Sequence, residues 1–136
     1  MEPEVAGGWG DNIEVDRSVH PPIVTKLQYH FDGWLGDALL ESFPCFIVTE
    51  SAKQRIESAR LTGTTFAPVE VTTSECFEEL HPNKKLPTFA WLTVHGKRGS
   101  DDFGLTSDAT LVVSERALGL LRQLGIPNAS VSEFRR

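Results

Sequence analysis

The chain has 136 residues, of which 40% are hydrophobic and 24% charged, so it is long enough to build one core and too apolar to be wholly disordered. Its net charge of -6 argues against a nucleic-acid-binding surface, which needs clustered Lys and Arg, and suits a basic protein partner. No run approaches the roughly 18 apolar residues that cross a bilayer, and the acidic start lacks the basic and apolar regions of a secretory signal, so we expect a cytoplasmic protein without membrane contact.

Residues 1–19 are polar and Gly-rich, and they contain one large aromatic side chain, that of Trp9. We expect a loosely ordered leader or an added edge segment here, followed by a single domain over residues 20–136. Exposure of an indole to water is unfavourable, so this side chain should either dock on the domain or contact a partner. Trp9 is therefore a candidate partner-binding residue.

Apolar and polar residues alternate from Ile23 to Phe31, which predicts a strand with one solvated face. The next segment, up to Cys45, holds two glycines and a proline and predicts a loop that can include one helical turn. We expect the aromatic side chains of this region, including those of Trp34 and Phe43, to lie in the core.

The run Phe46–Val48 predicts a buried strand that leads directly into a helix. Thr49 or Ser51 is the expected N-cap, and the helix should continue to about residue 60 and stop before Gly63. After it, residues 66–71 predict a strand and residues 75–80 a helical turn.

Residues 88–94 are apolar on both faces, which is typical of a central strand. The sequence GKRGSDDFG predicts an exposed loop, and Leu111–Val113 predicts another strand. Ser114 is the expected cap of a helix whose apolar residues recur at helical spacing up to Leu124, and Gly125 ends it. Residues 129–134 predict a final strand.

The segments 46–63 and 111–125 resemble each other, because each runs from an apolar strand through a capping hydroxyl and an amphipathic helix to a glycine. A duplication and a chance likeness of two ordinary units explain this equally well. We predict a single α+β domain with a mixed or antiparallel sheet of about five or six strands and two main helices on one face.

Motifs for catalysis and metal binding are sparse. Asp102-Phe103-Gly104 matches the metal-binding tripeptide of protein kinases, but the kinase Gly-rich loop, strand lysine and catalytic loop are missing. Asp101, Asp102 and Asp108 do not have the spacing of a calcium loop, and no cysteine or histidine pair has metal-binding spacing. We therefore expect no metal and no cofactor.

Both cysteines are expected to be buried or half-buried small hydrophobes.

Two stretches of the chain are similar to segments of a known group of proteins. The run DFGLTSDATLVVSERALGLLRQLG, residues 102–125, and the run FIVTESAKQRIESARLTGTTFAPVEV, residues 46–71, resemble small bacterial immunity proteins of polymorphic toxin systems, in particular relatives of the double-CXXCG-motif group. The chain has neither CXXCG pair, so the zinc site of that group is not carried over. The resemblance implies a non-enzymatic protein that binds and neutralises a cognate toxin.

The sequence leaves three hypotheses about function open. The first is an acidic protein-binding module, such as an immunity protein, whose partner is a toxin or another basic protein. Its candidate contact residues are Trp9, Glu75, Glu78, Glu79, Asp101 and Asp102. The second is a small enzyme or ligand-binding protein, and a pocket assembled from His30, Cys45, Trp91 and His95 would favour it. The third is a homo-oligomer that associates through an exposed strand edge.

Overall fold

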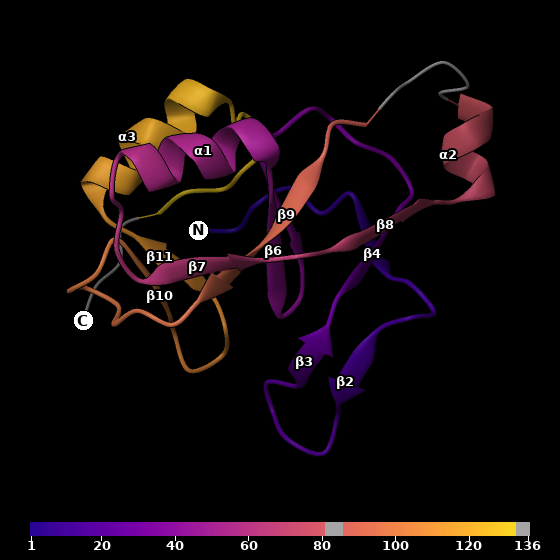
Figure 1. Cartoon of the computed structure of the whole chain (residues 1–136), viewed down its shortest axis with the longest axis horizontal. Helices are drawn as coiled ribbons and strands as arrows, with labels where there is room; N and C mark the ends of the chain where they lie inside the picture. The colour runs from indigo at the N-terminus through magenta and orange to yellow at the C-terminus, as the bar shows by residue number, and fades with distance from the viewer. Residues whose placement is uncertain (81–85, 133–136) are drawn as a thin grey trace.

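The computed structural model describes residues 1–80 and 86–132, and it shows an α+β fold (Figure 1). The largest sheet has four strands in the order β5 (Leu39–Ser42), β6 (Cys45–Thr49), β9 (Phe89–Val94) and β7 (Thr64–Ala67). All neighbouring strands in it are antiparallel. The expected central strand is thus confirmed, since β9 lies between β6 and β7.

A second sheet has three strands, β1 (Gly7–Trp9), β4 (Gln28–Phe31) and β8 (Glu70–Thr73). β4 pairs antiparallel with β1 and parallel with β8. The two sheets are joined at both edges. On one side β7 continues into β8 across Pro68 and Val69, and on the other Glu4 forms a parallel bridge to Leu40 of β5. Figure 1 shows β7 and β8 running nearly end to end.

The remaining four strands form two hairpins. The hairpin of β2 (Glu14–Asp16) and β3 (Ile23–Lys26) projects away from the helices, at the bottom of Figure 1. The hairpin of β10 (Phe103–Leu105) and β11 (Leu111–Val113) lies under the helix that comes after it in the chain.

Helices α1 (Glu50–Ser58) and α3 (Glu115–Leu124) lie side by side over the four-stranded sheet, whereas the short α2 (Glu75–Leu80) lies at the opposite end of the molecule (Figure 1). Each long helix starts where the sequence predicts. The hydroxyl of Thr49 accepts a hydrogen bond from the backbone of Ala52, and Ser114 does the same for Ala117. The two units that resemble each other in sequence therefore have the same capping geometry.

Alternating side chains of the central strands separate two hydrophobic cores. Phe46 and Val48 of β6 face the helices, together with Ala90 and Leu92 of β9. The opposite face of the same strands packs on the three-stranded sheet. Cys45, Ile47 and Phe89 of these strands are buried there against Tyr29 and Phe31 of β4. The molecule thus has three layers, namely helices, the four-stranded sheet and the three-stranded sheet.

The strand and helix content differs from the sequence prediction. The described residues form eleven strands in four sheets and three helices, instead of one sheet of five or six strands with two main helices. The predicted strand 23–31 is divided at Leu27, because β3 pairs in a hairpin and β4 pairs in the second sheet. The predicted strand 66–71 is likewise divided, since Pro68 lacks the N–H that a continuous ladder needs.

Two strands fall in segments that we expected to be loops. β5 at residues 39–42 pairs with β6 through a tight hairpin, and β10 at residues 103–105 pairs with β11. Both are too short for a clear period-two pattern, so neither was recognised from the sequence. Of the predicted last strand, Ser130 forms one bridge to Glu2, and Phe134 lies outside the described residues.

Residues 1–19 contribute β1 and β2 and are tied to the rest of the fold at several points. The backbone N–H of Ala6 donates to the Tyr29 hydroxyl at 2.9 Å, and Glu4, which is buried, accepts hydrogen bonds from the backbone of Leu35 and Asp37. Within this segment, β1 forms an edge strand of the three-stranded sheet.

Candidate functional site

The tight turn between β5 and β6 carries an exposed aromatic ring. Phe43 is 43% exposed, although its sequence context favours a core position, because the two-residue turn points it outward. The ring of His20 lies 6.2 Å from it, centroid to centroid. Val5, which is 66% exposed, lines the same cavity as Phe43. We call the surface formed by Val5, His20, Phe43 and Pro44 the Phe43 face.

A cavity of about 440 Å³ adjoins the Phe43 face and contains three carboxylates, those of Glu2, Glu41 and Asp108. We call it the acidic notch. Glu41 is half-buried, and its carboxylate makes no hydrogen bond or ion pair with any described residue. Burial raises the pKa of Glu41, the nearby charge of Glu2 raises it further, and the amino terminus opposes both effects. A cation placed in the notch would relieve this unfavourable environment.

On the other side of Pro44 lies a second cavity, of about 430 Å³, which we call the uncharged pocket. Its walls come from four segments: Pro21, Pro22 and Val24; residues 44–46; residues 91–94; and residues 105–107 with Ala109. None of these residues has a charged side chain. Ala109 belongs to both cavities, so the acidic notch and the uncharged pocket are neighbours.

The structure brings together two of the four residues predicted to form a ligand pocket. Cys45 and Trp91 both line the uncharged pocket. His30 lies elsewhere, on the outer face of the three-stranded sheet, where its Nδ1 is 2.7 Å from the hydroxyl of Thr72. His95 is exposed and comes directly after the end of β9, and it lines neither cavity.

The thiol of Cys45 is buried, and burial raises its pKa to about 12. It is therefore protonated at neutral pH and behaves as part of an apolar wall rather than as a nucleophile. Cys76 is exposed on α2, contrary to the expectation that both cysteines are at least half-buried, because α2 turns Phe77 rather than Cys76 into the core. His81, the histidine nearest to Cys76 in the sequence, lies outside the described residues.

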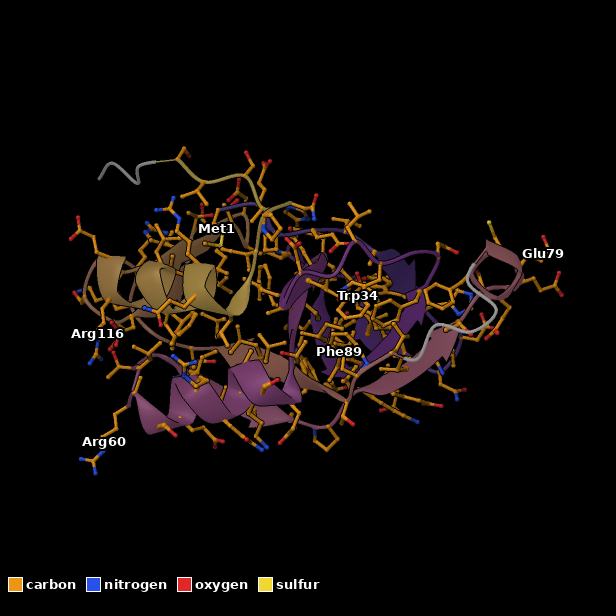
Figure 2. The ribbon with its side chains drawn as sticks, turned by 90° about the horizontal axis from the view of Figure 1, so that it is seen from above. Met1, Trp34, Arg60, Glu79, Phe89 and Arg116 are labelled. Carbon is orange, nitrogen blue, oxygen red and sulfur yellow. The ribbon has the colours of Figure 1, made fainter. Side chains whose placement is uncertain are left out.

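The predicted acidic rim is not one surface. Glu75, Glu78 and Glu79 are exposed on α2, at the end of the molecule opposite Arg60 and Arg116 (Figure 2). Asp101 and Asp102 lie near Arg116 instead, since Asp102 pairs with it. The sequence places the two acidic groups only 22 positions apart at their nearest members, Glu79 and Asp101, but β9 carries the chain across the molecule between them.

Asp102 is buried and holds the structure together, so its carboxylate is not available on a rim. It accepts hydrogen bonds from the backbone of Thr62 at 2.9 Å, from the Ser114 hydroxyl at 2.6 Å and from Arg116 at 2.7 Å. The Arg116 hydrogen bond holds the pKa of Asp102 well below its usual range; burial opposes this, and the bonds from Ser114 and Thr62 add to it. Asp101 is half-buried, and its carboxylate accepts the backbone N–H of Lys97.

Trp9 is half-buried and docks on the domain, packed against the core between the two sheets. The guanidinium of Arg17 lies 5.3 Å from the centroid of its ring. The indole Nε1 is buried and has no hydrogen-bond partner among the described residues. Of the two roles that the sequence allowed for this indole, docking on the domain is the one seen in the structure.

No three histidine, cysteine or acidic side chains gather into a possible metal site in the described part of the chain. The Phe43 face and the acidic notch were missed by sequence reasoning. The only local signal was an aromatic residue next to a proline in a short connection, and that signal is common. Glu41 gave no signal, because its neighbours Glu2 and Asp108 lie far away in the sequence.

Comparison of the chain with protein-family models, with curated proteins and with solved structures finds no match. Among residues 1–80 and 86–132, no helix has the length and apolar character needed to cross a membrane.

Proposed function

We propose that this protein is a protein-binding module that recognises a basic partner through the Phe43 face and the acidic notch. The observation that carries the proposal is the placement of an exposed Phe43 and Val5 beside three carboxylates in one cavity. Partner-binding sites commonly centre on an aromatic anchor, and charge complementarity selects and orients the partner.

Glu41 gives the notch its preference for a cation. Its half-buried carboxylate makes no hydrogen bond or ion pair within the described residues, because the amino terminus of Met1, which lines the same cavity, donates to the Leu111 carbonyl instead. A Lys or Arg side chain from another protein would supply a direct ion pair. Phe43 and Val5 line the same cavity and would contact the apolar stem of such a side chain. The net charge of -6 would further favour a basic partner over an acidic one.

We further propose that the partner is a toxin, as the resemblance to immunity proteins implies. Binding would neutralise it by covering its active surface, and this mechanism needs no catalytic group on the present chain. The two sequence stretches that carry the resemblance span β6, α1, β7 and the start of β8, and β10, β11 and α3. Asp108 is the one proposed contact residue inside them, so the other contact residues come from the structure and not from the resemblance.

The test uses the protein encoded by the gene next to that of the present chain. Co-expression should protect cells from this neighbour if it is toxic, and titration calorimetry should show a complex that weakens as salt is added. We expect Phe43→Ser and Glu41→Gln each to weaken binding at least about tenfold, the loss typical of an interface anchor.

Two matched controls address folding and location. Val131→Ser changes a similarly exposed apolar residue that lines a different cavity, and Glu79→Gln removes a carboxylate from α2. Both should bind as the unchanged protein does. Equal losses for Phe43→Ser and Val131→Ser would rule out the Phe43 face, and a neighbour that is neither toxic nor bound would rule out the immunity role.

A further inference from the structure

The uncharged pocket has the size and lining of a small-molecule site. Ligand cavities commonly measure about 300–1,000 Å³ and are mostly apolar, and this one measures about 430 Å³. Trp91 contributes an aromatic surface, and Cys45, Phe46 and Leu105 contribute apolar walls. Displacement of water from such a surface by an apolar ligand is favourable in free energy.

Two features restrict the backbone of the pocket walls, namely prolines and hydrogen bonds within a loop. Pro21, Pro22 and Pro44 have restricted backbones. The loop from β10 to β11 is fixed by its own hydrogen bonds: the backbone of Thr106 donates to the Thr110 carbonyl at 2.9 Å, and Ala109 donates to the Thr106 carbonyl at 3.0 Å. A preformed cavity costs a ligand little ordering free energy.

The polar groups of the pocket are largely engaged within the protein. The Thr93 hydroxyl donates to the Thr65 carbonyl at 2.9 Å, and the Thr106 hydroxyl bonds to Asp108 and accepts from the backbone of Thr110. No lining side chain is charged, so the pocket offers no counter-ion to a charged ligand. The adjacent acidic notch and the net charge of -6 also disfavour anions, including fatty-acid carboxylates.

We propose that the uncharged pocket is a binding site for a neutral aromatic small molecule. The uncharged pocket and the protein-binding surface are neighbours that have only Pro44 and Ala109 in common, so they are two distinct sites. The proposal therefore does not depend on the proposed partner, and Phe43→Ser tests the one while Ser107→Phe tests the other.

The experiment is a fluorescence titration of the full chain with N-phenyl-1-naphthylamine, a neutral aromatic dye whose emission rises in apolar sites. The anionic dye 8-anilinonaphthalene-1-sulfonate serves as the comparison. We expect saturable binding of the neutral dye, at least about tenfold tighter than that of the anionic dye, and displacement of the neutral dye by indole. Binding of the anionic dye with equal or higher affinity would overturn the proposal, and so would the absence of saturable binding.

Ser107 provides the site-directed test, because it is exposed at the mouth of the pocket. Ser107→Phe should fill the pocket and weaken dye binding at least about tenfold, whereas Gln54→Phe, which adds the same side chain to the exposed surface of α1, should leave it unchanged. Circular dichroism should give the same spectrum for both variants as for the unchanged protein. Equal binding by these two variants would overturn the assignment of the dye to this pocket.

Alkylation of Cys45 supplies a second measurement of dye binding. In a Cys76→Ser background Cys45 is the only thiol, and because it is buried it should react with N-ethylmaleimide only as the fold opens. A dye that binds the folded protein should therefore slow this reaction by about tenfold when it is present at ten times its dissociation constant. The Ser107→Phe variant, which binds dye weakly, should show little protection at the same dye concentration. Unchanged alkylation of the Cys76→Ser protein under saturating dye would contradict the proposal.

Discussion

Asp102 joins the segment after α1 to the start of α3. Its carboxylate accepts from Thr62 after α1, from Ser114 at the start of α3 and from Arg116 within α3. Arg116 also donates to the carbonyls of Ala59 and Arg60 at the end of α1. Asp102 therefore fixes the end of α1 against the beginning of α3. This is a structural role and not the partner contact that its sequence context suggested.

Replacing Asp102 by Asn should destabilise the protein by about 2 kcal/mol at pH 7, because the charge-assisted hydrogen bonds are lost. The folded-state pKa of Asp102 is lowered, so its contribution is complete above the unfolded pKa of about 4 and is lost as the pH falls through the folded value. The stability gap between the two proteins should therefore narrow as the pH falls from about 5 to about 2. Urea unfolding across this range measures it.

Asp11→Asn is the control for this comparison, since Asp11 is exposed and its side chain makes no hydrogen bond within the described residues. It should unfold at the same urea concentration as the unchanged protein at pH 7. A gap between the Asp102→Asn and unchanged proteins that widens on acidification would mean that the carboxylate is not stabilised in its charged form.

At the scale of elements, the two strand–helix units have the same local pattern of a capping hydroxyl and a buried alanine at different places in the fold. Both caps are extended in backbone conformation, and in both helices the third residue after the cap is a fully buried alanine. The units differ in the segments that come after them. Residues after α1 enter β7, whereas the described residues after α3 form no strand and pair with another segment only through the isolated β-bridge at Ser130.

The two caps should differ in their contribution to stability. Thr49→Ala should cost about 1 kcal/mol, the usual loss for an N-cap. Ser114→Ala should cost about 2 kcal/mol, because Ser114 also donates to Asp102. Ser51→Ala, at the alternative cap predicted from the sequence, should change stability by less than about 0.5 kcal/mol because Ser51 is exposed. Thermal or urea unfolding measures all three, and an equal loss at Thr49 and Ser114 would show that the bond to Asp102 contributes nothing.

At the scale of the whole molecule, the two sheets share their edges and enclose a core, while the helices cover a second core on the outer face of the four-stranded sheet. The connection from β7 to β8 makes the cores depend on each other, since one extended segment belongs to both sheets. We therefore expect the described part of the chain to unfold cooperatively.

The two thiols report whether the core between the sheets is closed in the folded state. Cys76 is exposed and should react with Ellman's reagent within the first minutes, whereas Cys45 is buried in the core between the sheets and should react only as the fold opens. One thiol per chain should thus react quickly in buffer and both in denaturant. In the Cys76→Ser protein the fast reaction should disappear, and its persistence would mean that Cys45 is accessible in the folded state.

The sequence by itself determined the elements whose signals are local. The helix ending at Leu124, the buried strand before Thr49 and the central strand 89–94 were all predicted, because capping and apolar periodicity depend on residues within a few positions of each other. The α+β class was inferred from these elements. The division of the strand at Leu27 could not be read in this way, since it reflects different pairing partners on its two sides.

Only the tertiary structure decided which residues form the candidate sites. Asp102 is buried and hydrogen-bonded, whereas the Glu41 carboxylate has no partner among residues 1–80 and 86–132. The difference comes from contacts such as that between Thr62 and Asp102, which are 40 positions apart in the chain. The exposure of Phe43 and the meeting of Cys45 with Trp91 likewise depend on sheet pairing across long stretches of sequence. Local patterns carry no information about such contacts, because the free energy that fixes them comes from the packing of distant segments.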